Sequence, residues 1–199
     1  MVELAVTRYA DTGAAFDGTV FVNNPRTQCS SGTLDNKSTW TWASTSTMTV
    51  AEVHTLVTGA FNQMAAFADD KGEILGKVPD CFIVPRNLYI PFCQGLASMN
   101  QSGSVPALPP ANPTGVMQVG PYKMMLNYQA SSQIIVYALN TTSEVKPLVM
   151  IERQQPTVGG ITDTASDWWH IKRKIPYIAH DRFKFGYGDP RDAIEVTIS

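Results

Sequence analysis

Three cysteines and three histidines are the side chains of this sequence best suited to bind a metal ion or to act as nucleophile and base. Cys29, Cys81 and Cys93 are not spaced as a CxxC pair or a Cys/His knuckle, so we expect three free thiols in a reducing compartment. The histidines lie far apart, and His170 stands alone in a strand-like stretch, where a hydrogen-bonded structural role is commoner than ligation. These residues predict no metal site.

The acidic residues and short motifs do not predict a catalytic site either. Asp69 and Asp70 follow a predicted helix, where the helix dipole disfavours acids, and with Lys71 they are expected to form a solvated turn. The sequence contains no GxSxG, HExxH, Walker or GxGxxG motif. We therefore expect no catalytic residue, no cofactor and no cofactor-binding residue, and we predict that the protein is not an enzyme.

Two groups of residues are better suited to contacts between molecules. Lys172, Arg173 and Lys174 form the densest basic cluster. This cluster is compatible with a solvated strand face, with pairing to acidic residues of a neighbouring subunit, or with contact to enclosed nucleic acid. Trp40 and Trp42 lie two residues apart, hence on one face of an extended segment. That segment is predicted to be either a surface loop pinned by its aromatic rings or a contact arm, since exposed tryptophan is favoured at interfaces.

A third candidate contact region is the segment 97–115, which contains four prolines, two glycines and three serines. This composition disfavours regular structure, and loops of this length are usually functional or disordered. We expect a mobile excursion or a subdomain boundary here. Its candidate interface residues are Pro106, Pro109 and Pro110.

The overall composition limits the class of partner. Only 16% of the residues are charged and the net charge is -2, so nucleic-acid binding driven by electrostatics is not expected. The 44% of hydrophobic residues argues against a disordered chain. No secretory signal is visible, and the longest apolar run, Ile134–Leu139, is far shorter than the ~20 residues of a membrane helix. We expect a soluble intracellular product without membrane contact.

The strongest helical pattern covers residues 49–70. Thr49 and Glu52 fit a capping box, in which each side chain accepts a hydrogen bond from the other residue's free amide. Apolar residues then recur at spacings of three and four, which predicts an amphipathic helix, and Gly72 is placed to end it.

The remaining elements are predicted mostly as strands. Cys81–Val84 is a predicted buried strand, and a short helix beginning at Arg86 should be interrupted or shortened by Pro91. The stretch 133–139 is nearly continuous in apolar residues and is predicted to be a central strand. Further strands are predicted at 116–119, 123–128, 145–152, 168–178, 182–185 and 193–198.

Five stretches, taken in order, resemble one protein family. They are FDGTVFVN at 16–23, FADDKGEILG at 67–76, VPDCFIVPR at 78–86, KPLVMIER at 146–153 and YIAHDRFKFGYGDPR at 177–191. Together they resemble the major head (capsid) subunit of Mu-like tailed bacteriophages, a family that is similar in turn to the wider HK97-type capsid fold. The combination of segments carries the resemblance, because no single motif is specific.

The resemblance implies an α+β, HK97-like capsid fold with mixed, mostly antiparallel sheets and one main amphipathic helix at about 49–70. It divides the chain into an N-terminal segment with a polar loop at 1–47, a peripheral-domain-like region at 48–96 and 141–199, and an axial-domain-like region with the Pro-rich loop at 97–140. Family members carry an N-terminal arm, an extended β-hairpin loop and a long spine helix ahead of the matched stretch. We expect this chain to lack all three.

The function implied by the resemblance is that of a major capsid subunit. Such a subunit self-assembles through hexameric and pentameric capsomers into an icosahedral-type shell around phage DNA. The implied location is the virion, after synthesis in the bacterial host cytoplasm. The implied partners are other copies of the chain, other phage head proteins and, without sequence specificity, the packaged DNA.

Three alternatives to a major capsid subunit stay open at this point. The first is a phage decoration or head-closure protein, which binds preformed shells. The second is a subunit of an encapsulin-like compartment with the same fold. The third is a small ligand-binding or hydrolytic domain, which would need clustered polar groups between the 49–70 helix and the sheet.

Overall fold

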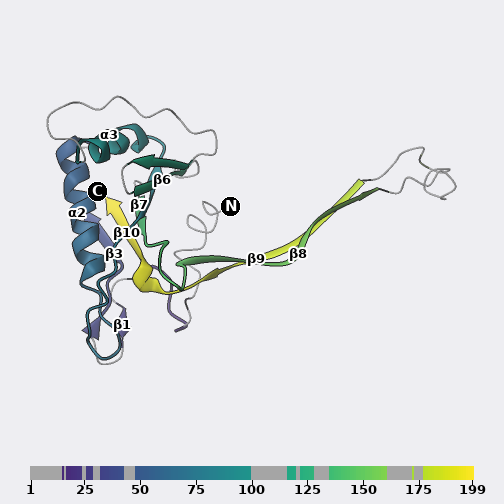
Figure 1. The fold of residues 1–199 in the computed structure, drawn as a ribbon, viewed down its shortest axis with the longest axis horizontal. Helices are drawn as coiled ribbons and strands as arrows, with labels where there is room; N and C mark the ends of the chain where they lie inside the picture. Colours follow the sequence, from purple (N-terminus) through teal and green to yellow (C-terminus); the bar gives the residue numbers. More distant parts are fainter. Residues whose placement is uncertain are drawn as a thin grey trace. The chain divides into compact units, whose positions relative to one another are not determined.

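The computed structural model describes residues 15, 17–23, 26–28, 32–42, 48–99, 116–119, 122–127, 135–160, 172 and 177–199. The chain divides into two compact units. Figure 1 colours the chain by residue number, so that the residues of each unit can be found along it. The first unit, called the body, comprises residues 1–148 and 187–199. The second unit comprises residues 149–186, and its strand residues 149–160 and 177–186 are called the ribbon.

The body is built on a six-stranded sheet with the strand order β3-β10-β7-β4-β6-β5. In that order the strands are Lys37–Trp40, Ala193–Ile198, Ile135–Leu139, Cys81–Pro85, Tyr122–Asn127 and Val116–Val119. β3 is parallel to β10 and β4 is parallel to β6, whereas the other three pairs are antiparallel. The predicted α+β class with a mixed sheet is therefore confirmed. A separate antiparallel pair is formed by β1 (Thr27–Gln28) and β2 (Gly32–Thr33).

The central strands are the most apolar ones. All five residues of β4 are buried, as are Val136 to Leu139 of β7. A strand with neighbours on both sides and covered faces needs apolar residues in succession, and the stretch 133–139 has them. Its predicted central position is confirmed over the described residues 135–139. Residues 37–40, which were expected to lie in a loop or arm, instead form the edge strand β3.

Helix α2 (Val50–Ala65) begins as predicted. The N–H of Thr49 donates to Oε2 of Glu52 at 2.7 Å, and the N–H of Glu52 donates to Oγ1 of Thr49 at 3.3 Å, which completes the capping box. The helix ends earlier than expected. The Asp69 carboxylate accepts the N–H groups of Lys71 and Glu73, and this local turn competes with further helix. Gly72, at φ 88°, lies within the turn and does not end the helix.

Helix α3 (Tyr89–Met99) begins at Tyr89 and not at Arg86 as predicted, and the expectation that Pro91 interrupts or shortens it is wrong. Pro91 is the third residue of the helix. In the first turn an N–H group has no partner within the helix, so proline can be accommodated there without losing a hydrogen bond.

Glycine brings the two helices together. A Cβ atom on Gly95 would lie 2.5 Å from Cβ of Val53, so only glycine permits this approach without a shift. At the same crossing, Nε2 of His54 lies 3.1 Å from the carbonyl oxygen of Gly95 and 2.8 Å from Oγ of Ser98. The imidazole of His54 therefore bridges α2 and α3 as part of the scaffold.

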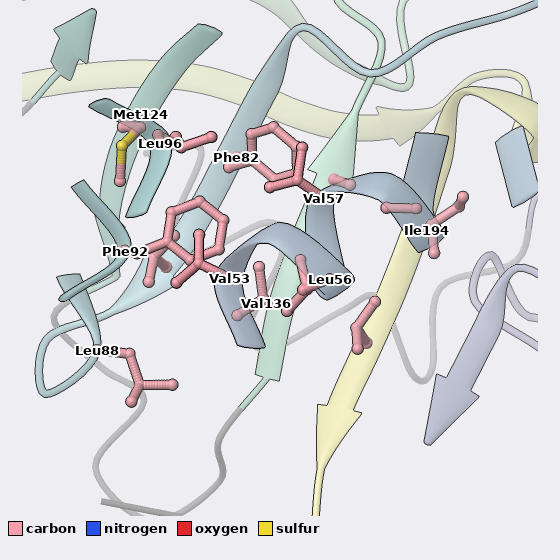
Figure 2. Packing of buried hydrophobic residues seen from close by; sticks show 14 of the residues in the cluster. Val53, Leu56, Val57, Phe82, Leu88, Phe92, Leu96, Met124, Val136 and Ile194 are labelled. Atoms are coloured by element: carbon pink, nitrogen blue, oxygen red, sulfur yellow. The ribbon is translucent and has the colours of Figure 1, made fainter. Parts of the chain in front are cut away.

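The main hydrophobic core lies between these helices and one face of the sheet (Figure 2). Its members include Val53, Leu56 and Val57 of α2, Phe92 and Leu96 of α3, and Phe82, Met124, Val136 and Ile194 of the sheet. Successive residues of a strand point to opposite faces. Accordingly Cys81 and Ile83 belong to a second cluster, together with Phe21, Val22, Tyr137, Leu139 and Ala193. The body thus buries apolar side chains on both faces of its sheet.

The second sheet consists of β8 (Leu148–Gly160) and β9 (Tyr177–Tyr187), which lie side by side in Figure 1. Both strands differ from the prediction. β8 continues to Gly160, and β9 runs without a break through residues 179–181, which separated two predicted strands. Of the residues between β8 and β9, the structure describes only Lys172. A short 3-10 helix, η1 (Pro190–Asp192), follows β9 and leads into β10.

The two compact units differ from the regions expected from the sequence. β4 lies in the expected region 48–96, yet it pairs directly with β6 and β7 from the expected region 97–140. The second unit, 149–186, lies inside the expected region 141–199. The chain was expected to lack an extended β-hairpin loop ahead of the matched stretch, and the ribbon is an extended pair of strands within that stretch. The assignment of peripheral and axial regions stays a prediction.

Candidate functional site

The ribbon exposes apolar side chains along both of its strands. Val158 is 75% exposed and Tyr177 is 72% exposed. Further exposed apolar residues are Val149, Met150, Ile151, Ile178 and Phe183. A two-stranded sheet by itself is marginally stable in water, because it has no second layer to cover such side chains. Contiguous exposed apolar surface marks an interaction site, so the ribbon is the candidate functional site.

The register of the two strands gives the ribbon two distinct faces. Residues two apart in a strand share a face. A Cβ atom on Gly186 would lie 3.9 Å from Cδ1 of Ile151, which puts even-numbered residues of β9 on the same face as odd-numbered residues of β8. Phe183 and Phe185 lie on the opposite face of β9, with ring centroids 5.6 Å apart.

Each face combines apolar residues with charges of one sign. The first, called the basic face, carries three cations and no acid among the described residues of the ribbon. It consists of Val149, Ile151, Arg153, Gln155 and Thr157 of β8 and of Ile178, His180, Arg182 and Lys184 of β9. The second, called the acidic face, carries two acids and no cation among the same residues. It consists of Met150, Glu152, Gln154, Pro156 and Val158 of β8 and of Tyr177, Ala179, Asp181, Phe183 and Phe185 of β9.

The body residues that flank the ribbon in the chain are fixed by packing. Leu148 and Tyr187 pack against the second hydrophobic cluster, and the ring of Tyr187 stacks on that of Phe21 with centroids 4.9 Å apart. The N–H of Gly188 donates to the carbonyl oxygen of Pro147 at 3.0 Å. A Cβ atom on Gly188 would lie only 2.1 Å from the carbonyl oxygen of Lys146, so only glycine permits this close contact. The body therefore holds both chain ends from which the ribbon strands continue.

An ion cluster holds η1, the turn that follows β9. Nζ of Lys77 lies 2.9 Å from Oδ2 of Asp189 and 2.7 Å from Oδ2 of Asp192, and Nε of Arg191 lies 3.0 Å from Oδ1 of Asp189. Burial raises the pKa of Asp189, but the hydrogen bonds from Lys77 and Arg191 outweigh burial and leave that pKa below its ordinary value. For the fully buried Asp192, burial outweighs the attraction of Lys77, so its pKa is raised. These charges are arranged to neutralise one another within the body.

The structure places the predicted tryptophans partly within the body. Trp40 and Trp42 are both half-buried and pack against the main core. A Cβ atom on Gly59 would lie 2.1 Å from Cη2 of Trp40, so the indole ring lies directly over α2. The tryptophans thus contribute to the core, and their role as interface residues stays a prediction.

The other predicted interface residues fall mostly outside the described residues. Arg173, Lys174, Pro106, Pro109 and Pro110 all lie outside them, whereas Lys172 is described and is exposed. Lys172 is not part of a strand, although a strand was predicted at 168–178.

Among the residues that the structure describes, the cysteines and histidines that could do chemistry are not gathered into a metal site. Cys81 and Cys93 are buried thiols, and burial raises the pKa of each to about 11, so both stay protonated at neutral pH. Cys29 and His170 lie outside the described residues. Across the parts of the chain that the structure describes, no three His, Cys, Asp or Glu side chains are placed to hold a metal ion. Nor does any described helix combine the length and the apolar character needed to cross a membrane.

Sequence reasoning missed the charged residues of the ribbon, although a signal for them is present. Between residues 177 and 185 the aromatic and acidic residues occupy odd positions, and the basic residues occupy even positions. An unbroken alternation of this kind predicts one strand with two different faces. Reading the stretch as two separate strands hid the pattern.

Of three comparisons with known proteins, only the comparison with solved structures finds a similar protein. Neither a scan against protein-family models nor a search of curated proteins finds a match to this sequence. Among solved structures, the chain is similar to the capsid structure of the cyanophage P-SCSP1u, with a TM-score of 0.53 and 12% sequence identity. The likeness covers 84% of this chain and 54% of that chain, so this chain spans about half the length of the capsid chain. The protein therefore has a capsid-like fold.

Proposed function

We propose that this protein is a structural subunit of a phage head, and specifically a major capsid subunit of the HK97-type fold that self-assembles into a shell around DNA. The observation that carries the proposal is the likeness to the cyanophage capsid chain, which extends over most of this chain. The ordered resemblance of five sequence segments to Mu-like head subunits points in the same direction.

The physical character of the molecule supports a shell subunit. Repeated contacts between identical copies close into rings or extend into larger assemblies, and many weak contacts add up to a stable particle. The ribbon supplies an exposed apolar surface for such contacts. With only 16% charged residues, the chain also limits repulsion between closely packed copies. Such a protein needs shape and complementary surfaces, and it needs no reacting group.

The proposal is tested by measuring the assembly state of the full chain. Light scattering after gel filtration, with negative-stain microscopy of the same fractions, is expected to show rings or shells. A monomer at every concentration and salt condition would contradict the proposal. A protein that binds only to preformed phage heads would instead be a decoration or head-closure protein, and particles loaded with protein cargo would indicate a compartment.

The basic cluster predicted from the sequence belongs to the same proposal. Reversing the charges of Lys172, Arg173 and Lys174 is expected to reduce particle yield more than it changes the folding of the subunit. The expected cause is the loss of pairing with acidic residues of neighbouring copies. Circular dichroism of the unassembled subunit serves as the folding control, and an unchanged particle yield would exclude a role for this cluster in assembly.

A further inference from the structure

We infer that the ribbons of neighbouring copies stack on one another, with the basic face of one ribbon packed against the acidic face of the next. The inference rests on the proposed function, since it names the contact through which copies of the chain assemble. Its basis is the separation of charge between the two faces of one exposed element.

The charges favour one of the possible pairings between ribbons over the others. Two basic faces in contact would oppose Arg153, Arg182 and Lys184 to a second copy of themselves. Two acidic faces would likewise oppose Glu152 and Asp181 to their own copies. Like charges brought together across an interface are costly, whereas a basic face against an acidic face brings opposite charges together.

The apolar residues suit the same contact. Stacked sheets lie about 10 Å apart and interdigitate their side chains. On the basic face Ile151 and Ile178 are 58% and 45% exposed, and on the acidic face Met150 and Phe183 are 46% and 44% exposed. Stacking would remove these side chains from water and would give each two-stranded ribbon the second layer that it lacks.

A contact between two different faces is directional. Each ribbon offers one basic and one acidic face, so each copy can contact two neighbours, one on either side. Such head-to-tail contacts close into a ring where the rotation permits and otherwise continue as an open assembly. This is the kind of contact on which a shell of identical subunits depends.

The other surface that could attract the basic face is the body of a second copy. Outside residues 149–186 the chain has nine basic and 13 acidic residues, so the rest of the chain carries a net negative charge. The test must therefore separate stacking between ribbons from binding of a ribbon to a body.

Two variants of the full chain reverse one face each. Arg182→Glu with Lys184→Glu leaves Arg153 as a cation of the basic face but makes the net charge of both faces negative, and Glu152→Lys with Asp181→Lys makes the net charge of both faces positive. Each is expected to weaken association about tenfold or more, measured by sedimentation or light scattering over a concentration series. The matched controls change the net charge equally on exposed body residues. They are Lys71→Glu with Arg86→Glu, and Asp70→Lys with Glu144→Lys, and both should stay within about twofold of the parent.

The deciding experiment restores complementarity. A chain with all four ribbon substitutions has faces whose net charges are exchanged in sign, and it should regain much of the association that each double variant loses. An equimolar mixture of the two ribbon variants should also associate, because each offers the face that the other lacks. Circular dichroism of each variant shows that the body is folded.

The outcomes separate the inference from the proposed function. Loss of association in both ribbon variants without restoration in the combined chain or the mixture would overturn stacking in favour of a contact with the body. Ribbon variants that assemble like their controls would overturn the inference and leave the shell function standing. A parent chain that stays monomeric under all conditions would overturn both.

Discussion

The body and the ribbon differ in how far their apolar side chains are buried. In the body, the apolar side chains of the sheet and of two helices are buried against one another, and Val53, Phe82 and Ile194 are fully inaccessible to water. In the ribbon, apolar side chains of both strands are exposed. The body therefore obtains its stability from contacts within the chain, whereas the ribbon can bury its apolar residues only with the help of further contacts.

The density of charged residues also differs between the two compact units. Residues 149–186 hold six of the chain's 15 basic residues and four of its 17 acidic residues in 38 positions. The other 161 positions hold the remainder and are more sparsely charged. Dense charge beside exposed apolar residues is typical of a surface selected for specific contacts, since charge sets partner and orientation while apolar area supplies affinity.

The largest expected effect comes from truncating the same residue type in the two regions. Phe82→Ala removes a ring that is buried between Phe92 and Tyr122, and it should lower the free energy of unfolding by about 3–5 kcal/mol. Phe183→Ala removes an exposed ring from the ribbon, and it should change this free energy in the unassembled subunit by no more than about 0.5 kcal/mol. Urea unfolding followed by circular dichroism measures both.

If Phe183→Ala destabilised the subunit as much as Phe82→Ala, the claim that exposed ribbon residues contribute little to the stability of the unassembled subunit would be wrong. The same variant sharpens the comparison in the assembled state, because loss of the exposed ring is expected to weaken association. Gel filtration with light scattering of Phe183→Ala at matched concentrations measures that loss.

The second comparison removes a lysine from each region. Lys77→Met takes the ammonium group from two carboxylates, one of which, Asp192, is fully buried. Loss of one partner of a buried ion pair should cost about 3 kcal/mol at neutral pH. Lys184→Met changes an exposed side chain of the ribbon, and it should leave the stability of the unassembled subunit within about 0.5 kcal/mol of the parent.

The cost of Lys77→Met should also depend on pH. Burial already raises the pKa of Asp192, and removing the ammonium group raises it further. A carboxyl group whose pKa is raised by folding favours the folded state below its unfolded pKa and loses that contribution as pH rises through the folded pKa. The destabilisation should therefore shrink between pH 7 and pH 4. Equal cost at both pH values would show that the ammonium group does not stabilise the Asp192 carboxylate.

Local sequence signals predicted the parts of the body that depend on near neighbours. The capping box of Thr49 and Glu52 is complete within three residues, and the helical stripe that follows it needs no partner to be recognised. The apolar run at 133–139 likewise indicates a central strand, because only a strand covered on both faces needs such a run. The start of α2 and the central position of β7 follow from these signals.

Signals between distant residues were not accessible in the same way. Edge strand β3 pairs with β10, which is more than 150 residues further along the chain. No local pattern in Lys37–Trp40 predicts this pairing. The two faces of the ribbon depend on how β8 and β9 are aligned, which a single strand does not reveal. Gly95 is needed because Val53 packs against it, and this contact too arises only on folding.

The third comparison adds one methyl group in each region. Gly95→Ala would place Cβ 2.5 Å from Cβ of Val53, which forces α2 and α3 apart and should cost about 1–3 kcal/mol. Gly159→Ala adds the same group to β8, where no heavy atom beyond the two chain neighbours lies within 4 Å of the new Cβ, so no loss is expected. Thermal unfolding of both variants measures the difference, and a Gly95→Ala chain as stable as the parent would show that the helices can move apart freely.

The smallest expected effect concerns acid stability of the body. The Asp80 carboxylate accepts hydrogen bonds from the N–H and hydroxyl of Thr141 and from Nζ of Lys123. Partial burial raises its pKa, but these bonds outweigh burial and hold the pKa below its ordinary value of 3.8. A carboxyl group whose pKa is lowered by folding stabilises the folded state above its unfolded pKa, and this contribution is lost as pH falls through the folded pKa.

Asp80→Asn should therefore cost about 1–2 kcal/mol at pH 7, because an amide is a weaker acceptor than a carboxylate. The cost should decrease as the pH falls below about 4 and through the lowered pKa of the folded carboxyl group, where the Asp80 of the parent becomes protonated. Glu152→Gln is the matched change on the exposed ribbon. It should not alter how the free energy of unfolding decreases at acid pH. Urea unfolding between pH 2 and pH 7 compares the three chains. If Glu152→Gln reduced the loss of stability at acid pH as much as Asp80→Asn does, the ribbon would contribute to the stability of the isolated subunit as the body does.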